Sequence, residues 1–410
     1  MNFSSFLFLS LFAVISASST SYFLYLSDLH YDPHYLEISE GGKGGDYCRK
    51  LLPLPESARA VYGRPDCDPP YKLMVSAFDA AKKIAPKPPF IVFGGDMAAH
   101  SLHSSKEVLS VIRNVTEEIA SRYPNTPIIS CLGNNDVYPH YQSINLKKIA
   151  SIWGPYLYST KSASELSKVG FYRWENDSVV PNMVFLVLNT NIYSTKHHRA
   201  GKHPDPDGQF EWLTNNLRQC QAQNTKVIII GHISPGHNAK GNILWQKFFT
   251  KKYISILNSY GTTVIGQFFG HMHADDFRFV GDQTSPIFLG GALSPIRFNN
   301  PNFRVVSFDE SGIVDLESWY IDLLESNRRR KTEWKKQYSV KEVYGMKDLT
   351  TKSLVKMIND IEKNDEYWNS FINYRSALFF PKRFDFVCNM RELKDGHYHQ
   401  CLKDNSDIYV

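Results

Sequence analysis

Five short clusters of carboxylate, amide and imidazole side chains are spread along the sequence, and each cluster follows an apolar run. They are Asp28-Leu29-His30, Gly94-Gly95-Asp96, Gly133-Asn134-Asn135-Asp136, Gly231-His232 and Gly270-His271-Met272-His273. One such cluster alone is more often a turn or a helix cap than a metal site. Together, however, these side chains suit Zn²⁺ or another divalent first-row metal. The set therefore predicts a metal centre that activates water for hydrolysis.

The apolar runs before the clusters predict strands that are buried on both faces, because they are rich in β-branched and aromatic residues. These and similar runs cover residues 22–27, 90–93, 127–132, 183–188, 227–230 and 264–269. Side chains at the carboxyl ends of buried strands converge on one rim of a sheet. Glycine beside a ligand lets the backbone approach a metal without a Cβ clash. We therefore expect the five clusters to meet.

Helical patterns separate the strands, which indicates an α/β fold. We expect helices over residues 71–83, 104–123, 210–223 and 245–258, with Ser104 as an N-cap. Further strands near Ile287 and Val305 would complete a second sheet. From Ser311 onward, polar helical segments with interspersed aromatic residues predict a C-terminal helical subdomain. The expected division is a signal peptide over 1–18, a catalytic domain over 19–310 and the helical subdomain over 311–410.

Composition places the chain among globular proteins. Its 410 residues, of which 42% are hydrophobic, can fill a sizeable core, and repeats and low-complexity runs are absent. The net charge of +5 suits an anionic substrate. Lys and Arg are scattered rather than gathered into a stripe, so nucleic-acid binding is not indicated. We expect a monomer.

The N-terminus has the layout of a secretory signal peptide, with an apolar stretch over 6–15 followed by Ala17 and Ser18. An uncleaved anchor or a buried strand is the alternative. No later run approaches ~18 apolar residues, so we expect no transmembrane helix in the mature chain. Asn114 and Asn176 begin sequons for N-glycosylation. These features favour a secreted protein or one of the lysosomal or vacuolar lumen.

Six cysteines fit an oxidising compartment, where disulfides persist. Cys48 and Cys67 bracket a loop rich in glycine and proline, and Cys388 and Cys401 bracket the polar C-terminus. Both pairs are candidates for local disulfides, although six cysteines allow 15 connectivities. Buried free thiols are the expectation for the other two, Cys131 and Cys220.

In their order, the five clusters resemble the motifs of the calcineurin-like metallophosphoesterases, which run Asp-x-His, Gly-Asp, Gly-Asn-His-Asp/Glu, Gly-His and Gly-His-x-His. The resemblance covers residues 22–309. More closely, SDLHYDPHY, PPYKLMVSAFD, FEWL, GQFFGHMH and the segment 294–305 resemble the acid sphingomyelinase-like phosphodiesterases. The fold that this resemblance implies is a β-sandwich flanked by helices.

The same resemblance implies a binuclear centre. Its ligands would be Asp28, His30 and His273 for one metal and Asn134, His232 and His271 for the other, with Asp96 bridging both. Zn²⁺ is expected first, with iron or manganese as alternatives. The implied reaction is attack of a metal-bridging hydroxide on a phosphodiester or phosphoanhydride, without a covalent intermediate.

Two positions bear on how the leaving group departs. His100 lies four residues after Asp96, where the sphingomyelinase-like family also places a histidine, and it is the candidate general acid. His103 is a competitor for that role, and a surface loop histidine is the alternative reading of His100. Asn135 departs from the family pattern, which has histidine there, and an amide is not a useful acid.

This departure suggests a substrate. A phosphate that leaves an anhydride is a weaker base than an alkoxide and needs protonation less. The Gly-Asn-Asn-Asp segment also resembles endopolyphosphatase relatives. We therefore expect polyphosphate or nucleoside polyphosphates to be cleaved better than sphingomyelin. The alternatives are a sphingomyelin phosphodiesterase that releases phosphocholine and, from another class, a catalytically silent secreted binding protein.

Five further residues are weaker candidates for contacts with substrate. His198 and His203 lie in a basic loop that could meet phosphates or be merely solvated. Asn300 and Arg304 match a family segment near the active site, where a packing role is equally compatible. His237 follows the fourth cluster and would either support the metal ligands or be exposed.

Overall fold

Two six-stranded sheets form the centre of the molecule in a computed structural model that describes residues 20–35, 48, 60–199, 201–281, 284–375 and 383–405. The expected signal peptide at 1–18 lies outside these residues. The first sheet runs, in spatial order, β12 (Trp334–Ser339), β11 (Gly312–Ile321), β10 (Asn302–Asp309), β1 (Ser21–Leu26), β2 (Ile91–Phe93) and β3 (Ile128–Ser130). The second runs β4 (Tyr172–Glu175), β5 (Met183–Val187), β6 (Lys226–Ile230), β7 (Val264–Phe269), β9 (Ile287–Leu289) and β8 (Asp276–Arg278).

The two sheets pack face to face through aromatic side chains. Phe23 of β1 meets Phe268 of β7 edge-on, with ring centroids 5.3 Å apart. Phe90, next to β2, meets Phe185 of β5 in the same manner at 4.7 Å. All four side chains are fully buried. This packing confirms the expected β-sandwich.

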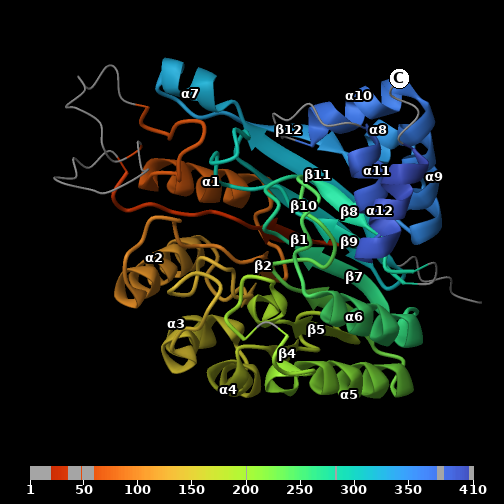
Figure 1. Ribbon diagram of the computed structural model, residues 1–410. Helices are drawn as coiled ribbons and strands as arrows, with labels where there is room; N and C mark the ends of the chain where they lie inside the picture. Colours follow the sequence, from red (N-terminus) through yellow and green to blue (C-terminus); the bar gives the residue numbers. More distant parts are fainter. Residues whose placement is uncertain are drawn as a thin grey trace, which may run out of the picture.

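Helices cover the outer faces of the sandwich (Figure 1). On the side of the first sheet lie α1 (Tyr71–Ile84), α2 (Ser105–Arg122) and α3 (Leu146–Leu157), while α4 (Thr160–Val169) packs against α3 and beside β4 of the second sheet. On the side of the second lie α5 (Gln209–Ala222) and α6 (Lys247–Tyr260), which share a hydrophobic cluster with β5 and β6. The expected N-cap is confirmed, because the Ser104 hydroxyl accepts a hydrogen bond from the Glu107 amide at 3.2 Å.

The first sheet continues beyond residue 311, where the sequence indicates polar helices. In β11 the burial alternates, so that Leu316 and Ser318 are buried while Glu317 between them is not. This period of two belongs to a strand with one covered face. In β12, Lys335 and Lys336 are exposed, as is common on an edge strand. The interspersed polar residues therefore mark an edge of the sheet rather than a helix surface.

The expected C-terminal helices follow these strands and pack beside β8, β9 and β11 (Figure 1). They are α8 (Val340–Tyr344), α9 (Thr351–Lys363), α10 (Asp365–Tyr374), α11 (Arg383–Arg391) and α12 (Asp395–Asp404), while the short α7 (Leu323–Arg329) connects β11 to β12. The predicted C-terminal helical region is thereby confirmed, with its helices after the sheet beginning at Val340.

Both expected cysteine pairs are joined. The S–S distances are 2.02 Å for Cys48–Cys67 and 2.06 Å for Cys388–Cys401. Cys131 and Cys220 are free and buried, as expected. Asn114 is exposed on α2 and Asn176 is half-buried after β4, and their glycosylation stays a prediction. No helix in the described part of the chain is long and apolar enough to cross a bilayer.

The strand order brings the five ligand clusters to one edge of the sandwich. β1 pairs in parallel with β2, and β2 with β3. In the second sheet β6 pairs in parallel with β7. The segments that follow these five strands carry the five clusters, so they leave the sheets on the same side.

Candidate metal centre

The loops at this edge hold unusual backbone conformations. Most of the candidate ligands have φ between 51° and 70°, the left-handed region that non-glycine residues rarely adopt. These residues are Asp28, His30, Asp96, His271 and His273. Each such residue costs about 1–3 kcal/mol, and strain of this kind is concentrated at functional sites. The chain therefore maintains an unfavourable backbone at the positions where the side chains converge.

One group at this edge consists of Asp28, His30 and His273, all buried. The Nε2 atoms of the two histidines are 3.1 Å apart, and His273 Nε2 lies 3.3 Å from Asp28 Oδ1. His30 Nδ1 lies 3.1 Å from the carbonyl oxygen of Ala98. If that nitrogen donates to the carbonyl, Nε2 carries the lone pair that a cation needs.

The second group contains His232, His271 and Asn134. His232 Nε2 lies 3.2 Å from Asn134 Oδ1, and its Nδ1 lies 2.8 Å from the carbonyl oxygen of Gly94. The rings of His232 and His271 are perpendicular, with centroids 5.3 Å apart. The backbone amide of His271 also donates to the Asp28 carboxylate at 3.0 Å, which ties this group to the first.

Asp96 lies between the two groups. Its Oδ2 atom is 3.5 Å from His30 Nε2 and 3.1 Å from His232 Nε2. One carboxylate oxygen therefore faces a ligand of each group, which is the position of a bridging ligand. All seven residues expected to bind metal are thus brought together.

The electrostatics of this pocket favour positive charge. Burial opposes protonation of His232, but the carboxylates of Asp96 and Asp28 overcome it and raise the pKa of His232 to about 9. Burial lowers the pKa of His271 to about 3, which leaves that imidazole neutral and able to act as a ligand. Buried carboxylates that draw positive charge to His232, a neutral His271 and facing nitrogen atoms are what two divalent cations would require, so the residues fit them.

Asp136 and Asn135 position the bridging carboxylate. Asp136 is buried and accepts hydrogen bonds from the backbone amides of Asp96, Met97 and Gly133 at 2.8–2.9 Å. Asn135 donates from its backbone amide to Asp96 Oδ1 at 2.7 Å and from its side chain to Asp96 Oδ2 at 2.9 Å. The side chain of Asn135 is therefore turned toward Asp96.

The candidate general acid His100 stacks on His30, with ring centroids 4.1 Å apart. Its Nδ1 atom is 3.0 Å from Asp68 Oδ1, and its backbone amide donates to Asp68 Oδ2 at 2.7 Å. Burial opposes its protonation, but Asp68 outweighs burial and raises the pKa of His100. The competitor His103 is exposed before α2, where its amide donates to Glu107. The geometry favours His100.

Asp68→Asn tests this positioning. The raised pKa keeps His100 protonated to higher pH, and its acid form is lost as pH rises through that value. The neutral amide of this variant cannot stabilise the protonated imidazole of His100, so the pKa of His100 should fall. The basic limb of the pH–rate profile should then move to lower pH. Above that limb the rate should fall roughly tenfold for each unit of pKa shift. Asp79→Asn on the exposed face of α1 is the control, and an unchanged profile would contradict the role.

Further residues border the site. Tyr141 has φ 66° and its ring centroid lies 6.3 Å from that of His271. The Lys196 ammonium donates to the Tyr141 hydroxyl at 3.1 Å. The exposed Arg297 is close enough to oppose protonation of His100. Nothing in the sequence marks Asp68, Tyr141 or Arg297, because each acts through a neighbour distant along the chain.

The basic loop lines a groove. His197, His198, Arg199, Lys202 and His203 line this groove together with residues that follow β3. The His198 ring and backbone amide both contact Gln142 Oε1, at 2.5 and 2.9 Å. His203 accepts from the amide of Asp205 at 3.1 Å. His198 is therefore held against the segment that follows β3, while the side chains of His198 and His203 are exposed.

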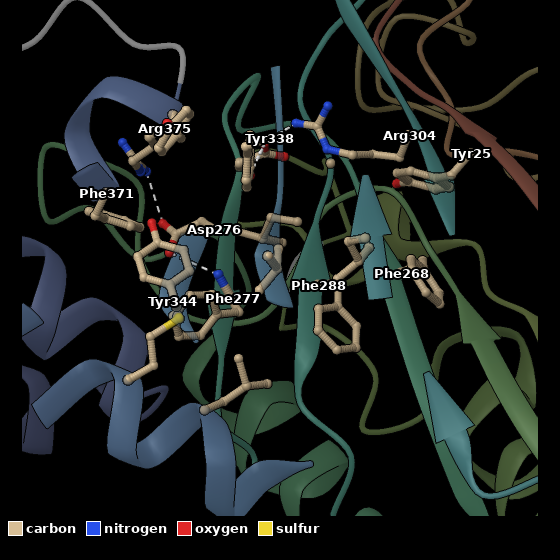
Figure 2. A pocket seen from close by; sticks show the side chains of 18 residues that line it. Tyr25, Phe268, Asp276, Phe277, Phe288, Arg304, Tyr338, Tyr344, Phe371 and Arg375 are labelled. Carbon is tan, nitrogen blue, oxygen red and sulfur yellow. Dashed lines mark hydrogen bonds and ion pairs between the residues drawn. The ribbon is translucent and has the colours of Figure 1, made fainter. Parts of the chain in front are cut away.

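The remaining candidates contact residues other than the seven candidate ligands. Arg304 pairs with Asp275 and donates to Ser318 at 2.8 Å, in a cavity between the sandwich and the C-terminal helices (Figure 2). Asn300 accepts from the amide of Leu323 at 3.1 Å. Both contacts support packing roles. His237 is fully buried in another cluster, so the expectation of an exposed side chain is wrong.

A sandwich with these side chains at one edge defines a metal-dependent phosphoesterase. The family model described as Calcineurin-like phosphoesterase matches residues 22–275, and the model described as Acid sphingomyelin phosphodiesterase C-terminal region matches residues 284–408. The chain belongs to the calcineurin-like phosphoesterases of the acid sphingomyelinase-like type. The expected family and the expected phosphoester hydrolase activity are thereby confirmed.

Three relatives cover most of the chain. Cyclic GMP-AMP phosphodiesterase SMPDL3A from Homo sapiens is 30% identical over 93% of this chain and 90% of its own. Acid sphingomyelinase-like phosphodiesterase 3b from Homo sapiens is 28% identical over 93% of this chain and 90% of its own. Sphingomyelinase phosphodiesterase D from Dictyostelium discoideum is 26% identical over 93% of this chain and 94% of its own.

Proposed function

We propose that the seven converging side chains hold two divalent cations, with Zn²⁺ first among the candidates. We further propose that the chain hydrolyses anionic phosphodiesters or phosphoanhydrides, with nucleotides or polyphosphate favoured over sphingomyelin. Two cations at this edge would lower the pKa of a bound water and neutralise charge on the phosphoryl oxygens. The observation that carries the substrate preference is the amide of Asn135.

Asn135 cannot protonate a leaving group. Its side-chain amide donates to Asp96 Oδ2, so it holds the carboxylate in place. His100 then remains as the acid next to the centre, with Nδ1 held by Asp68 and the other ring nitrogen left to donate a proton. An alkoxide leaving group gains much from protonation, whereas a leaving phosphate gains little. A site with a single acid therefore suits anhydrides better than esters.

Positive charge beside the centre supports an anionic leaving group. Lys196 lies over the Tyr141 ring at 4.7 Å, and the basic loop lines a groove. Cationic side chains there would attract the remaining phosphates of a nucleotide or of polyphosphate. The name of one relative, cyclic GMP-AMP phosphodiesterase, also fits a nucleotide substrate.

A substrate panel on the wild type and on Asn135→His tests the proposal. We expect the Zn²⁺-loaded wild type to cleave polyphosphate or ATP faster than sphingomyelin. The added imidazole should raise ester hydrolysis relative to anhydride hydrolysis, because a second acid helps the more basic leaving group. The ratio of kcat/KM values for the two substrate classes is the measurement.

Metal content must be equal in both preparations, since Asn135 also supports Asp96. Asn215→His, at an exposed position of α5, controls for an added surface histidine. Faster cleavage of sphingomyelin by the wild type would contradict the proposed substrate.

We also propose that the protein works in the secretory route, outside the cell or in a lysosomal or vacuolar lumen. Two formed disulfides support this location, because such bonds persist in oxidising compartments.

A further inference from the structure

Three metal-ligand side chains meet at a second place, between the loop that follows β6 and the helix α12. His237 Nε2 lies 3.2 Å from Asp395 Oδ1, and His399 Nε2 lies 3.3 Å from the same oxygen. The three ligand atoms all lie within 4.8 Å of one another. None of these residues belongs to the candidate metal centre. His237 is fully buried, whereas His399 is exposed.

The two separations from Asp395 Oδ1, 3.2 and 3.3 Å, match edges of a coordination tetrahedron. Zn²⁺ binds imidazole nitrogen and carboxylate oxygen at about 2.0–2.2 Å, which places two ligands of one tetrahedral ion about 3.3–3.5 Å apart. The candidate metal centre gives an internal comparison, with His273 Nε2 and Asp28 Oδ1 at 3.3 Å. The distances of His237 and His399 from Asp395 Oδ1 are therefore close to a histidine–carboxylate distance at the candidate metal centre.

The carboxylate is presented with one oxygen toward both imidazoles. Lys247 of α6 holds Asp395 Oδ2 at 2.6 Å, which leaves Oδ1 facing His237 and His399. Asp395 and His399 are four residues apart on α12 and so share one face of the helix. A carboxylate fixed through its second oxygen is a common arrangement around a bound metal.

His237 is held firmly in place. Its carbonyl oxygen accepts hydrogen bonds from Arg278 at 2.6 Å and from Asn389 at 3.1 Å. Its ring stacks on Tyr398, with centroids 4.0 Å apart and planes 21° apart. The backbone and the ring of His237 are thus preorganised, which favours high affinity at a metal site.

The protonation of His237 favours a cation. Burial lowers the pKa of this histidine and keeps the ring neutral. Its Nδ1 atom is buried and has no hydrogen-bond partner. If Nδ1 carries the proton, the lone pair of Nε2 faces the Asp395 carboxylate, and a cation between them removes the repulsion. If Nε2 carries it, Nε2 donates to Asp395, and Nδ1 is unsatisfied in both tautomers, so the case for a cation rests on the geometry of the three side chains.

We propose that His237, Asp395 and His399 bind a Zn²⁺ ion, with water as the fourth ligand. Two imidazoles and one carboxylate are a donor set that suits this metal. The ion would fasten α12 to the loop behind His232, while the Cys388–Cys401 disulfide fastens the same helix to α11. It would act as a clamp between the C-terminal helices and the sandwich (Figure 1).

Metal analysis of the full-length protein tests this clamp. After loading with Zn²⁺ and gel filtration, His399→Gln should hold one ion fewer per chain than the wild type. The comparison uses the difference between variants, so it does not depend on how many ions the catalytic centre retains. His399→Gln should also lose at least about tenfold in the affinity of that one ion, measured by chelator competition.

His397→Gln is the matched control, because His397 is on the same helix and similarly exposed but contacts Glu392 instead. It should bind as many ions as the wild type. Asp395→Asn is a second variant with the same expected loss. Phosphoester hydrolysis should be retained in His399→Gln, which separates the clamp from the catalytic centre. Equal zinc content in the wild type and in both clamp variants would overturn the proposal.

Discussion

His100→Gln should lower kcat/KM about 10²–10⁴-fold for a phosphodiester whose leaving group is an alkoxide. His100 stacks on His30 at the candidate metal centre, and Asp68 raises its pKa, so it is placed and charged to protonate a leaving oxygen. A p-nitrophenolate leaving group needs no proton. The same variant should therefore hydrolyse bis(p-nitrophenyl) phosphate at close to the wild-type rate.

The dependence on the leaving group separates an acid from a structural residue, because a distorted centre would slow both substrates alike. His103→Gln, three residues further along, should leave both rates unchanged, since that side chain is exposed before α2. Equal losses on the two substrates would argue against His100 as the acid.

The strands of the sandwich and the candidate metal ligands can be predicted from the sequence, because each depends on a short stretch of residues. Each cluster follows its own buried strand directly, so strand pattern and ligand type are read from a few adjacent residues. Parallel pairing then brings separate clusters to one edge, as with Asp28 after β1 and Asp96 after β2. The N-cap at Ser104 can be predicted for the same reason, because its hydroxyl bonds an amide only three residues further along the chain.

What the sequence did not reveal depends on contacts between distant segments. Asp68 and His100 are in contact although 32 positions separate them in the sequence, and 55 positions separate Lys196 from Tyr141. His237 meets Asp395 across 158 residues. The polar residues of β11 and β12 indicate helices in the sequence, whereas the structure has strands with only one face covered. In each case the deciding neighbour is set by tertiary packing, which no short pattern records.

Asp96→Asn should reduce hydrolysis of every substrate by roughly 10³-fold or more. Asp96 Oδ2 lies within 3.5 Å of a histidine of each ligand group, so both cations would share its charge. An amide keeps the shape but removes that charge, and charge stabilisation by such cations is worth several kcal/mol, with about 1.4 kcal/mol for each factor of ten. Metal content should fall together with activity.

The loss of activity in Asp96→Asn should not depend on the leaving group, which distinguishes it from the loss of activity in His100→Gln. Without the carboxylate, the pKa of His232 is no longer held near 9, so its proton does not compete with a metal. Metal binding would nevertheless weaken, because the bridging charge contributes to both positions at once. Calorimetric titration with Zn²⁺ measures this directly. A variant that keeps both its metal content and its activity would show that Asp96 does not bridge the cations.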